Sequence, residues 1–257
     1  MTDTGKPAET GPEPGEALVL IPARMASTRL PDKPLADIAG QPMIVHVMVR
    51  AVEADVGRVV VAAGEDEIKA AIEAAGGHAV LTQPDHASGS DRIFEALQAV
   101  DPDNTFDVVI NLQGDLPTLD PALVTGVRDC LMETGADIAT LVADLADDEE
   151  WQNPNVVKAI VDFDGKVDAI AADFRREPDA ADRVRAYHHI GIYAYRRAAL
   201  DRFVHMDPSP REVAEKLEQL RAWEAGMTIA ARHVDTVPLG VDTAQDLERA
   251  RKILSDS

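Results

Sequence analysis

Short apolar runs alternate with segments of helical periodicity in the first half of the chain. The apolar runs are residues 17–22, 59–63 and 108–112. Uninterrupted runs of this length are typical of strands that are covered on both faces of a parallel sheet. Helical patterns cover residues 43–52 and 67–75, the second ends at Gly76-Gly77, and a short strand is predicted at 79–81. This order of strands and helices predicts an open α/β sheet with right-handed crossovers.

A β-rich pattern follows in the second half of the chain. A helix is predicted at 121–134, and strands at 139–142, 156–161, 166–171 and 188–195. Asp164-Gly165 is a hairpin signal between two of these strands. A helix at 213–224 would place Val213, Leu217, Leu220 and Trp223 on one apolar face, and a last helix at 243–253 would begin at Thr243 as its cap. We therefore expect one domain over residues 17–257, with a smaller β-rich elaboration over about 139–225.

The length and the composition agree with this organisation. A chain of 257 residues with 46% apolar residues can bury a large core, but it is short for two large domains. Residues 1–16 are polar and rich in proline and glycine, where a signal peptide would have a basic start and an apolar run. They are predicted to be a disordered leader. The sequence lacks the run of about eighteen apolar residues that a membrane-spanning helix needs.

The charge and the cysteine count narrow the class of protein further. Lys and Arg number 25 and Asp and Glu number 46, which gives a net charge of −21. Such a surface repels nucleic acids and anionic membranes, so neither is an expected partner, and an anionic ligand needs a local cluster of cations. Cys130 is the only cysteine and can form no intrachain disulfide. This favours a reducing compartment, the cytoplasm, over secretion.

The loop after the first apolar run, residues 22–35, carries the strongest chemical signal. It holds Arg24, Arg29 and Lys33. Ligands of open α/β sheets bind beyond the carboxyl ends of the strands, where backbone N–H groups and these cations could wrap a polyphosphate. A solvated basic turn is the alternative. The chain has no Walker, GxGxxG, HExxH, paired CxxC or GxSxG motif, which disfavours P-loop kinases, dinucleotide oxidoreductases, zinc proteases and α/β-hydrolases.

Two aspartates follow other apolar runs. Asp115 lies in the segment NLQGD, and Asp242 lies in PLGVD. Carboxylates at strand ends could together hold the Mg²⁺ that a nucleoside triphosphate needs during nucleotidyl transfer. Taken singly, Asp115 could serve turn chemistry and Asp242 could cap a helix.

Six segments together resemble the CMP-Kdo synthetase (3-deoxy-manno-octulosonate cytidylyltransferase) family in order and spacing. They are IPARMASTRLPDKPLADIAGQPMIVHV, DHASGSDR, NLQGD, HHIGIYAYR, LEQLR and GVDTAQDLERAR. The resemblance covers about residues 18–251. It implies a nucleotidyltransferase-type, Rossmann-like fold with a mixed, mostly parallel sheet flanked by helices, in which the elaboration serves dimerisation and sugar binding. It also implies a homodimer, dependence on Mg²⁺, and transfer of CMP from CTP to the anomeric hydroxyl of an acidic eight-carbon sugar for lipopolysaccharide biosynthesis.

The same resemblance implies roles for particular residues. Those expected to bind CTP are Pro22, Ala23, Arg24, Ser27, Arg29, Lys33, Ser88, Gly89, Arg92 and Gln113. The implied catalytic residues are Arg24, Lys33 and Asp115, and the implied metal ligands are Asp115 and Asp242. His189, Tyr193, Glu218 and Gln219 would face the sugar; strand periodicity places His189, Gly191, Tyr193 and Tyr195 on one face and assigns His188 to packing on the other.

Two positions depart from the family pattern. Leu116 replaces an acid beside the expected metal site, and Ala172 stands where an arginine is expected on the sugar side. Arg175 or Arg176 could substitute for that arginine. Alternatively, Asp173 and Glu177 could favour an acceptor with an amino group, such as 8-amino-8-deoxy-Kdo. A cytidylyltransferase for another acidic sugar or a phosphonate, and a non-catalytic nucleotide-binding protein, are the remaining alternatives.

Overall fold

The computed structural model describes residues 15–26 and 30–255. Most of the predicted leader, and the predicted ligand-binding residues Ser27 and Arg29, therefore lie outside the described residues. No helix within the described ranges combines the length and the apolar character that crossing a membrane requires.

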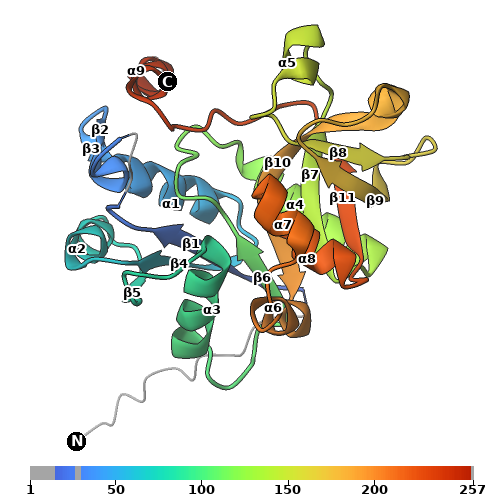
Figure 1. Ribbon diagram of the computed structural model, residues 1–257. Coiled ribbons are helices and arrows are strands. Elements are labelled where there is room, and N and C mark those ends of the chain that lie inside the picture. The colour runs from blue at the N-terminus through green and yellow to red at the C-terminus, as the bar shows by residue number, and fades with distance from the viewer. Residues whose placement is uncertain (1–14, 27–29, 256–257) are drawn as a thin grey trace, which may run out of the picture.

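The parallel half of the sheet is the one that the apolar runs predicted. Strand β1 (Ala17–Ala23) lies between β4 (Gly57–Ala63) and β6 (Val108–Asn111), and β5 (Ala79–Leu81) forms the edge (Figure 1). All these pairings are parallel. Alternate side chains of each strand face opposite ways, so both faces of this half need a covering layer of helices.

Helices supply both layers. One core joins Val19 and Ile21 to helices α1 (Met43–Glu53), α2 (Asp66–Ala74) and α4 (Pro121–Thr134). The other core joins Leu18 and Leu20 to helices α3 (Gly89–Val100), α6 (Arg197–Val204) and α8 (Gln219–Glu224). The strand residues alternate between the two cores with period two, which is why the runs are continuously apolar.

The second half of the sheet is antiparallel in part and closes on itself. Strand β10 (Ala186–Arg196) pairs antiparallel with β6, with β7 (Ile138–Ala143) and with β8 (Lys158–Val161). Strand β11 (Ile229–His233) runs parallel to β7, and β9 (Asp168–Arg175) pairs antiparallel with β11 and β8. Strands β10, β7, β11, β9 and β8 form a closed ring that takes in β11 beyond the bounds expected for the elaboration, and the predicted mixed α/β fold is confirmed.

The remaining elements are short or terminal. They are η1 (Lys33–Leu35), β2 (Asp37–Ile38), β3 (Gln41–Pro42), α5 (Asp148–Gln152), η2 (Ala180–Arg185), α7 (Pro210–Glu215) and α9 (Ala244–Ser255). Helix α9 begins as predicted, because the Asp246 N–H donates to Thr243 Oγ1 over 3.2 Å. The predicted hairpin is also confirmed, since Asp164 and Gly165 both have positive φ between the antiparallel strands β8 and β9.

The prediction of one continuous helix over 213–224 is wrong. Helix α7 ends at Glu215, Lys216 takes the left-handed conformation (φ 55°), and α8 starts at Gln219. The carbonyl of Glu215 accepts a hydrogen bond from Arg176 Nε over 2.6 Å, so a distant side chain caps the end of α7. Val213 is consequently 66% exposed, and only the later members of the expected apolar face are packed in the core.

Candidate active site

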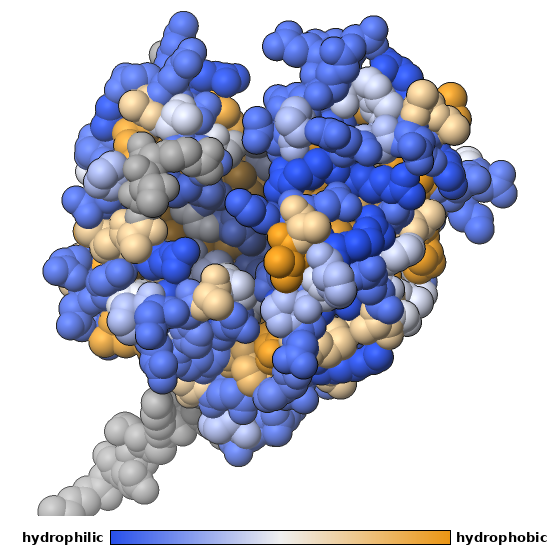
Figure 2. All heavy atoms as spheres, in the orientation of Figure 1, coloured by the Kyte–Doolittle hydropathy of each residue, from blue (hydrophilic) through white to orange (hydrophobic). Residues whose placement is uncertain are grey.

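A cavity of about 410 Å³ lies at the carboxyl ends of β1 and β6. Every described residue that was expected to bind CTP lines it: Pro22, Ala23, Arg24, Lys33, Ser88, Gly89, Arg92 and Gln113. Figure 2 shows a hollow in the otherwise mostly hydrophilic surface, between the half that carries α1 and the half that carries the elaboration. The position agrees with the general rule for open α/β sheets.

Lys33 joins the two predicted metal ligands. Its Nζ lies 2.9 Å from Asp115 Oδ2 and 3.2 Å from Asp242 Oδ1, although these residues are 82 and 209 positions away in the chain. Burial of the ammonium acts to lower the pKa of Lys33, but the two carboxylates outweigh it and raise that pKa. The structure thus brings Asp115 and Asp242 around one positive charge.

A backbone contact holds the two aspartates at this spacing. The Val241 N–H donates to the carbonyl of Asp115 over 2.9 Å, which ties the segment before α9 to the loop after β6. Leu116 next to Asp115 is 8% exposed and belongs to the core that includes α1 and α4. The leucine that departs from the family pattern is therefore a packing residue, and the adjacent aspartate keeps its place in the cavity.

The donor set fits Mg²⁺. Within residues 15–26 and 30–255 no group of three or more His, Cys, Asp and Glu side chains could hold a metal ion by itself. Mg²⁺ is usually bound through one or two carboxylates together with substrate phosphates and water. Asp115 and Asp242 already share one cation in the structure, which shows that they can converge on a charge between them.

Arg24 and Arg92, the arginines that line the cavity in the described part of the chain, differ in their surroundings. Arg24 is exposed, and its Nη1 donates to the carbonyl of His86 over 3.2 Å. Arg92 is buried below the cavity, where it donates to Thr82 Oγ1 over 2.6 Å and to the carbonyl of Pro84 over 3.0 Å. Arg92 therefore braces the loop before α3, while Arg24 has the reach to meet an anionic ligand.

Most of the segment 86–92, which lies in the DHASGSDR motif, begins a helix. Ser88 caps α3 through a capping box with Asp91, and Gly89 is the first helical residue. Because Ser88 and Gly89 line the cavity, the N-terminal N–H groups of a twelve-residue helix face it. Such a terminus favours an anion.

A second cavity of about 870 Å³ adjoins the first. The two share Gln113, Asp115 and Asp242 in their linings. Strand β10 contributes His188, His189, Ile190 and Gly191, and the segment before β8 contributes Asn153 and Asn155. Two compartments that meet at a pair of carboxylates can hold two substrates with their reacting groups next to one cation site.

Only one of the four residues expected to face the sugar lines this second cavity. His189 does so, whereas Tyr193, Glu218 and Gln219 are absent from both linings. Tyr193 lies behind His189, with ring centroids 5.5 Å apart. Glu218 accepts a hydrogen bond from Ser90 Oγ over 2.8 Å. Among the described residues, however, Glu218 Oε1 and Gln219 Nε2 are buried polar atoms with no hydrogen-bond partner, so contact with a ligand stays a prediction for both.

Glu218→Gln is expected to stabilise the protein at neutral pH. Burial raises the pKa of Glu218, although the hydroxyls of Ser88 and Ser90 oppose it. An acid with a raised pKa contributes stability below its ordinary pKa, and this contribution is lost as the pH rises through the folded-state value. Thermal unfolding from pH 4 to 8 should show a higher Tm for Glu218→Gln at pH 7 and a weaker decline of Tm with pH.

Glu212→Gln is the matched control. Glu212 is buried and accepts from Arg221 Nε over 2.9 Å and Nη2 over 2.6 Å, so its charge is compensated. Neutralising it should lower the Tm at pH 7. A lower Tm for Glu218→Gln as well would contradict the assigned cost of the Glu218 charge.

His188, which the sequence analysis assigned to packing on the other face of the strand, also borders the second cavity. Its side chain lines the second cavity, and Nδ1 is in contact with the Glu150 carboxylate of α5. Asn153, Asn155 and Arg249 also line this cavity without having been predicted. They come from the segment between α5 and β8 and from α9, and no local pattern in the sequence could have grouped them.

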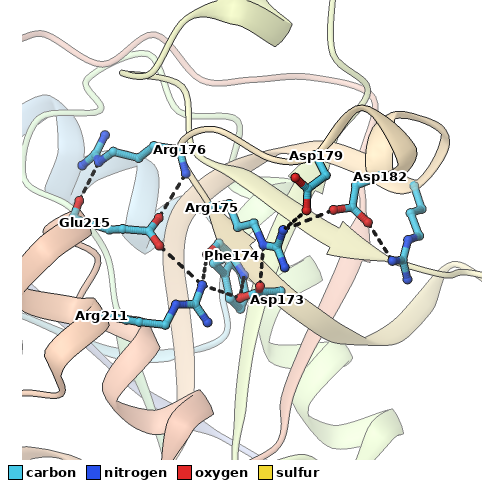
Figure 3. A network of polar contacts seen from close by, with 9 residues as sticks. Asp173, Phe174, Arg175, Arg176, Asp179, Asp182, Arg211 and Glu215 are labelled. Carbon is cyan, nitrogen blue, oxygen red and sulfur yellow. Dashed lines mark hydrogen bonds and ion pairs between the residues drawn. The ribbon is translucent and has the colours of Figure 1, made fainter.

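Asp173, one of the two acids near Ala172, has partners inside the protein. Asp173 is buried and accepts from Arg175 Nε over 2.6 Å and from Arg211 Nη2 over 2.9 Å (Figure 3). Arg176 is committed to backbone carbonyls, including that of Glu215. None of these residues lines either site cavity. Asp173 thus balances two guanidinium groups away from both cavities, so in this structure neither it nor Arg175 or Arg176 is placed to contact an acceptor there.

Comparison with known proteins finds a matching family, similar sequences and a similar structure. Residues 18–229 match the Cytidylyltransferase family. A 3-deoxy-manno-octulosonate cytidylyltransferase of Parvibaculum lavamentivorans is 60% identical over 242 residues, covering 94% of this chain and 93% of that protein. One of Rhodospirillum centenum is 58% identical and covers 94% of each chain. A solved structure of CMP:2-keto-3-deoxy-manno-octonic acid synthetase complexed with CTP has a TM-score of 0.85 and 38% identity, and the match covers 94% of this chain and 99% of that one.

Proposed function

Because the chain belongs to the cytidylyltransferase family, we propose that it transfers CMP from CTP to the anomeric hydroxyl of Kdo and releases pyrophosphate. The product would be an activated sugar for lipopolysaccharide biosynthesis. The observation that carries the proposal is the convergence of Lys33, Asp115 and Asp242 where the two cavities meet. The names of the relatives, and the CTP complex of the similar structure, support the choice of both substrates.

The first cavity would hold CTP. Arg24 and Lys33 would neutralise the triphosphate, and the N-terminal N–H groups of α3 at Ser88 and Gly89 would donate to its oxygens. Gln113 lies at the junction of the cavities, where it would orient the nucleotide. When the phosphates arrive, the Lys33 ammonium has a second set of anionic partners besides its two carboxylates.

The second cavity would hold the sugar, with its anomeric oxygen in line with the α-phosphorus and opposite the departing pyrophosphate. Mg²⁺, held by Asp115, Asp242 and phosphate oxygens, would supply neutralisation of the charge that develops on the transferred group. The chain itself contributes positioning in two adjoining compartments and fixed cations. These are the main sources of catalysis in phosphoryl-type transfer.

The homodimer and the cytoplasmic location are further parts of this proposal. The elaboration exposes large apolar side chains, with Val167 54%, Ile170 50% and Val184 91% exposed. A contact between two copies would cover such side chains. The molar mass in solution, measured by light scattering, would test for the dimer. The single, buried cysteine suits a reducing compartment.

The proposed function is tested by pyrophosphate release from CTP, with Kdo and 8-amino-8-deoxy-Kdo offered in parallel. Turnover with Kdo at least equal to that with the amino analogue is expected, and it should disappear when EDTA removes Mg²⁺ and return when Mg²⁺ is restored. Turnover only with the analogue, or only with another acidic sugar or a phosphonate, would reassign the acceptor. Nucleotide binding without turnover would indicate a non-catalytic role.

A further inference from the structure

The hydroxyl of Thr140 lies at a break in the pairing of β7 with β10. The register between these strands shifts between Ile190 and Tyr193. Thr140 is fully buried at this irregularity, and its Oγ1 lies 3.0 Å from the carbonyl of Ile190 and 2.9 Å from that of Ile192. His189 Nε2 lies 3.0 Å from the same oxygen. One hydroxyl thus meets three polar atoms in the wall beside the second cavity.

Counting protons assigns the direction of these hydrogen bonds. A threonine hydroxyl has one proton and two lone pairs, and carbonyl oxygens can only accept. The Thr140 proton must therefore point to the carbonyls of Ile190 and Ile192. A lone pair of Oγ1 then faces His189 Nε2, so this ring nitrogen has to carry a proton and donate it. An unprotonated Nε2 would set two lone pairs against each other in a buried place, which is costly.

The other ring nitrogen is left with a lone pair. Burial lowers the pKa of His189 to about 3, with a smaller effect from the neighbouring His188, so the ring is neutral at physiological pH. A neutral imidazole with a proton on Nε2 has an unprotonated Nδ1. No hydrogen bond joins Nδ1 to another side chain or backbone group in the described part of the chain.

Aromatic neighbours hold the ring in this orientation. Phe174 meets His189 edge to face with ring centroids 5.1 Å apart, and Tyr193 lies tilted against it at 5.5 Å. His189 is itself part of the lining of the second cavity. Because Nε2 is turned to Thr140, Nδ1 is the ring nitrogen left for a molecule in this cavity to reach.

We propose that Thr140 is a positioning residue that fixes His189 in the Nε2–H form, so that Nδ1 accepts a hydrogen bond from a hydroxyl group of the acceptor sugar. The proposal rests on the proposed function, because it names the group recognised in the acceptor cavity. A carboxylate at this point would meet a lone pair and be repelled, so the acidic group of the sugar must bind elsewhere. His189 thus selects a hydroxylated face of the sugar and sets its orientation.

The first test reads the tautomer directly and does not depend on activity. Nitrogen-15 NMR of the histidine side chains in the full-length protein distinguishes protonated from unprotonated ring nitrogens, and the His189 signals are assigned by their absence in His189→Gln. We expect a protonated Nε2 and an unprotonated Nδ1 between pH 6 and 8. A protonated Nδ1 in the wild-type protein would overturn the proposal whatever the acceptor proves to be.

The second test uses substitutions at Thr140. Thr140→Val keeps the shape but removes the hydroxyl, and we expect the KM for the acceptor to rise about tenfold with the KM for CTP unchanged. Thr140→Ser keeps the hydroxyl and should restore the wild-type values. An unchanged acceptor KM in a folded Thr140→Val protein, or failure of Thr140→Ser to rescue it, would overturn the positioning role. If Thr140→Val does not fold, the wild-type NMR spectrum still decides.

Failure of the proposed function has a different signature. If Kdo is not the acceptor, no variant shows turnover with Kdo, yet the ring of His189 keeps its proton on Nε2. The assignment of the tautomer and the assignment of the substrate can therefore fail independently.

Discussion

Asp115→Asn should lower turnover by roughly 10³-fold while leaving the fold intact. The substitution removes one of the two carboxylates that share the Lys33 ammonium, and with it one of the two carboxylates proposed to hold Mg²⁺. The side chain of Asp115 is 30% exposed, so the loss of this ion pair should cost little stability, about 1 kcal/mol or less. Pyrophosphate release and thermal unfolding measure the two effects separately.

Asp120→Asn is the matched control for this experiment. Asp120 lies five residues further along the chain and caps α4 by accepting from the Ala122 N–H over 2.9 Å. Asparagine caps helices as well as aspartate does, so turnover and Tm should both stay at wild-type values. Turnover of Asp115→Asn within threefold of the wild type would refute the role assigned to the pair of aspartates.

Gly114→Ala should lower kcat/KM by roughly 10²-fold, because the displacement of reacting groups by about 1 Å has effects of this size. A Cβ atom at Gly114 would lie 2.7 Å from the carbonyl oxygen of Pro22 and 3.2 Å from Ile44 Cδ1. The first neighbour is backbone of β1 and cannot move aside, so the loop must shift and carry Gln113 and Asp115 with it. The overpacking should also cost about 1–3 kcal/mol, seen as a lower Tm.

Gly126→Ala is a suitable control for the added methyl group. Gly126 lies within α4, and its nearest neighbours to a Cβ atom would be Arg232 Cδ at 3.6 Å and Leu141 Cδ2 at 3.9 Å. These are ordinary contacts, and alanine favours a helix over glycine by about 1 kcal/mol. The control should therefore raise the Tm and keep activity. Wild-type kcat/KM in Gly114→Ala would show that the close approach of this loop to β1 does not position the site.

The fold could be predicted wherever hydrophobic periodicity was local. The apolar runs and the helical pattern at 43–52 correspond to β1, β4, β6 and α1 within a few residues. A strand that is covered on both faces has to be apolar along its whole length. A helix that is covered on one face needs apolar residues that recur with the helical repeat. Prediction failed over 213–224, where the side chain of Arg176, some 40 residues away, takes the carbonyl that ends α7.

The described residues that line the first cavity could be predicted from the sequence, but their arrangement, and most of the lining of the second cavity, could not. The cation-rich loop, Asp115 and Asp242 are visible as unusual residues at the ends of apolar runs. His188 and Thr140 are not, because their chemistry arises from contacts with Glu150 and with the irregular stretch of β10. Asp173 shows the opposite error, since an acid that stood out in the sequence has two arginine partners in the structure.

The sequence by itself determined the α/β order of the elements, the apolar layers and the cation-rich loop after β1, because each of these depends on side chains close together in the chain. Only the tertiary structure decided that Lys33 lies between Asp115 and Asp242, that two cavities meet there, and that Thr140 Oγ1 lies within hydrogen-bond distance of His189 Nε2. Distances between groups 49 to 209 residues apart follow from strand order and register, which no local pattern encodes.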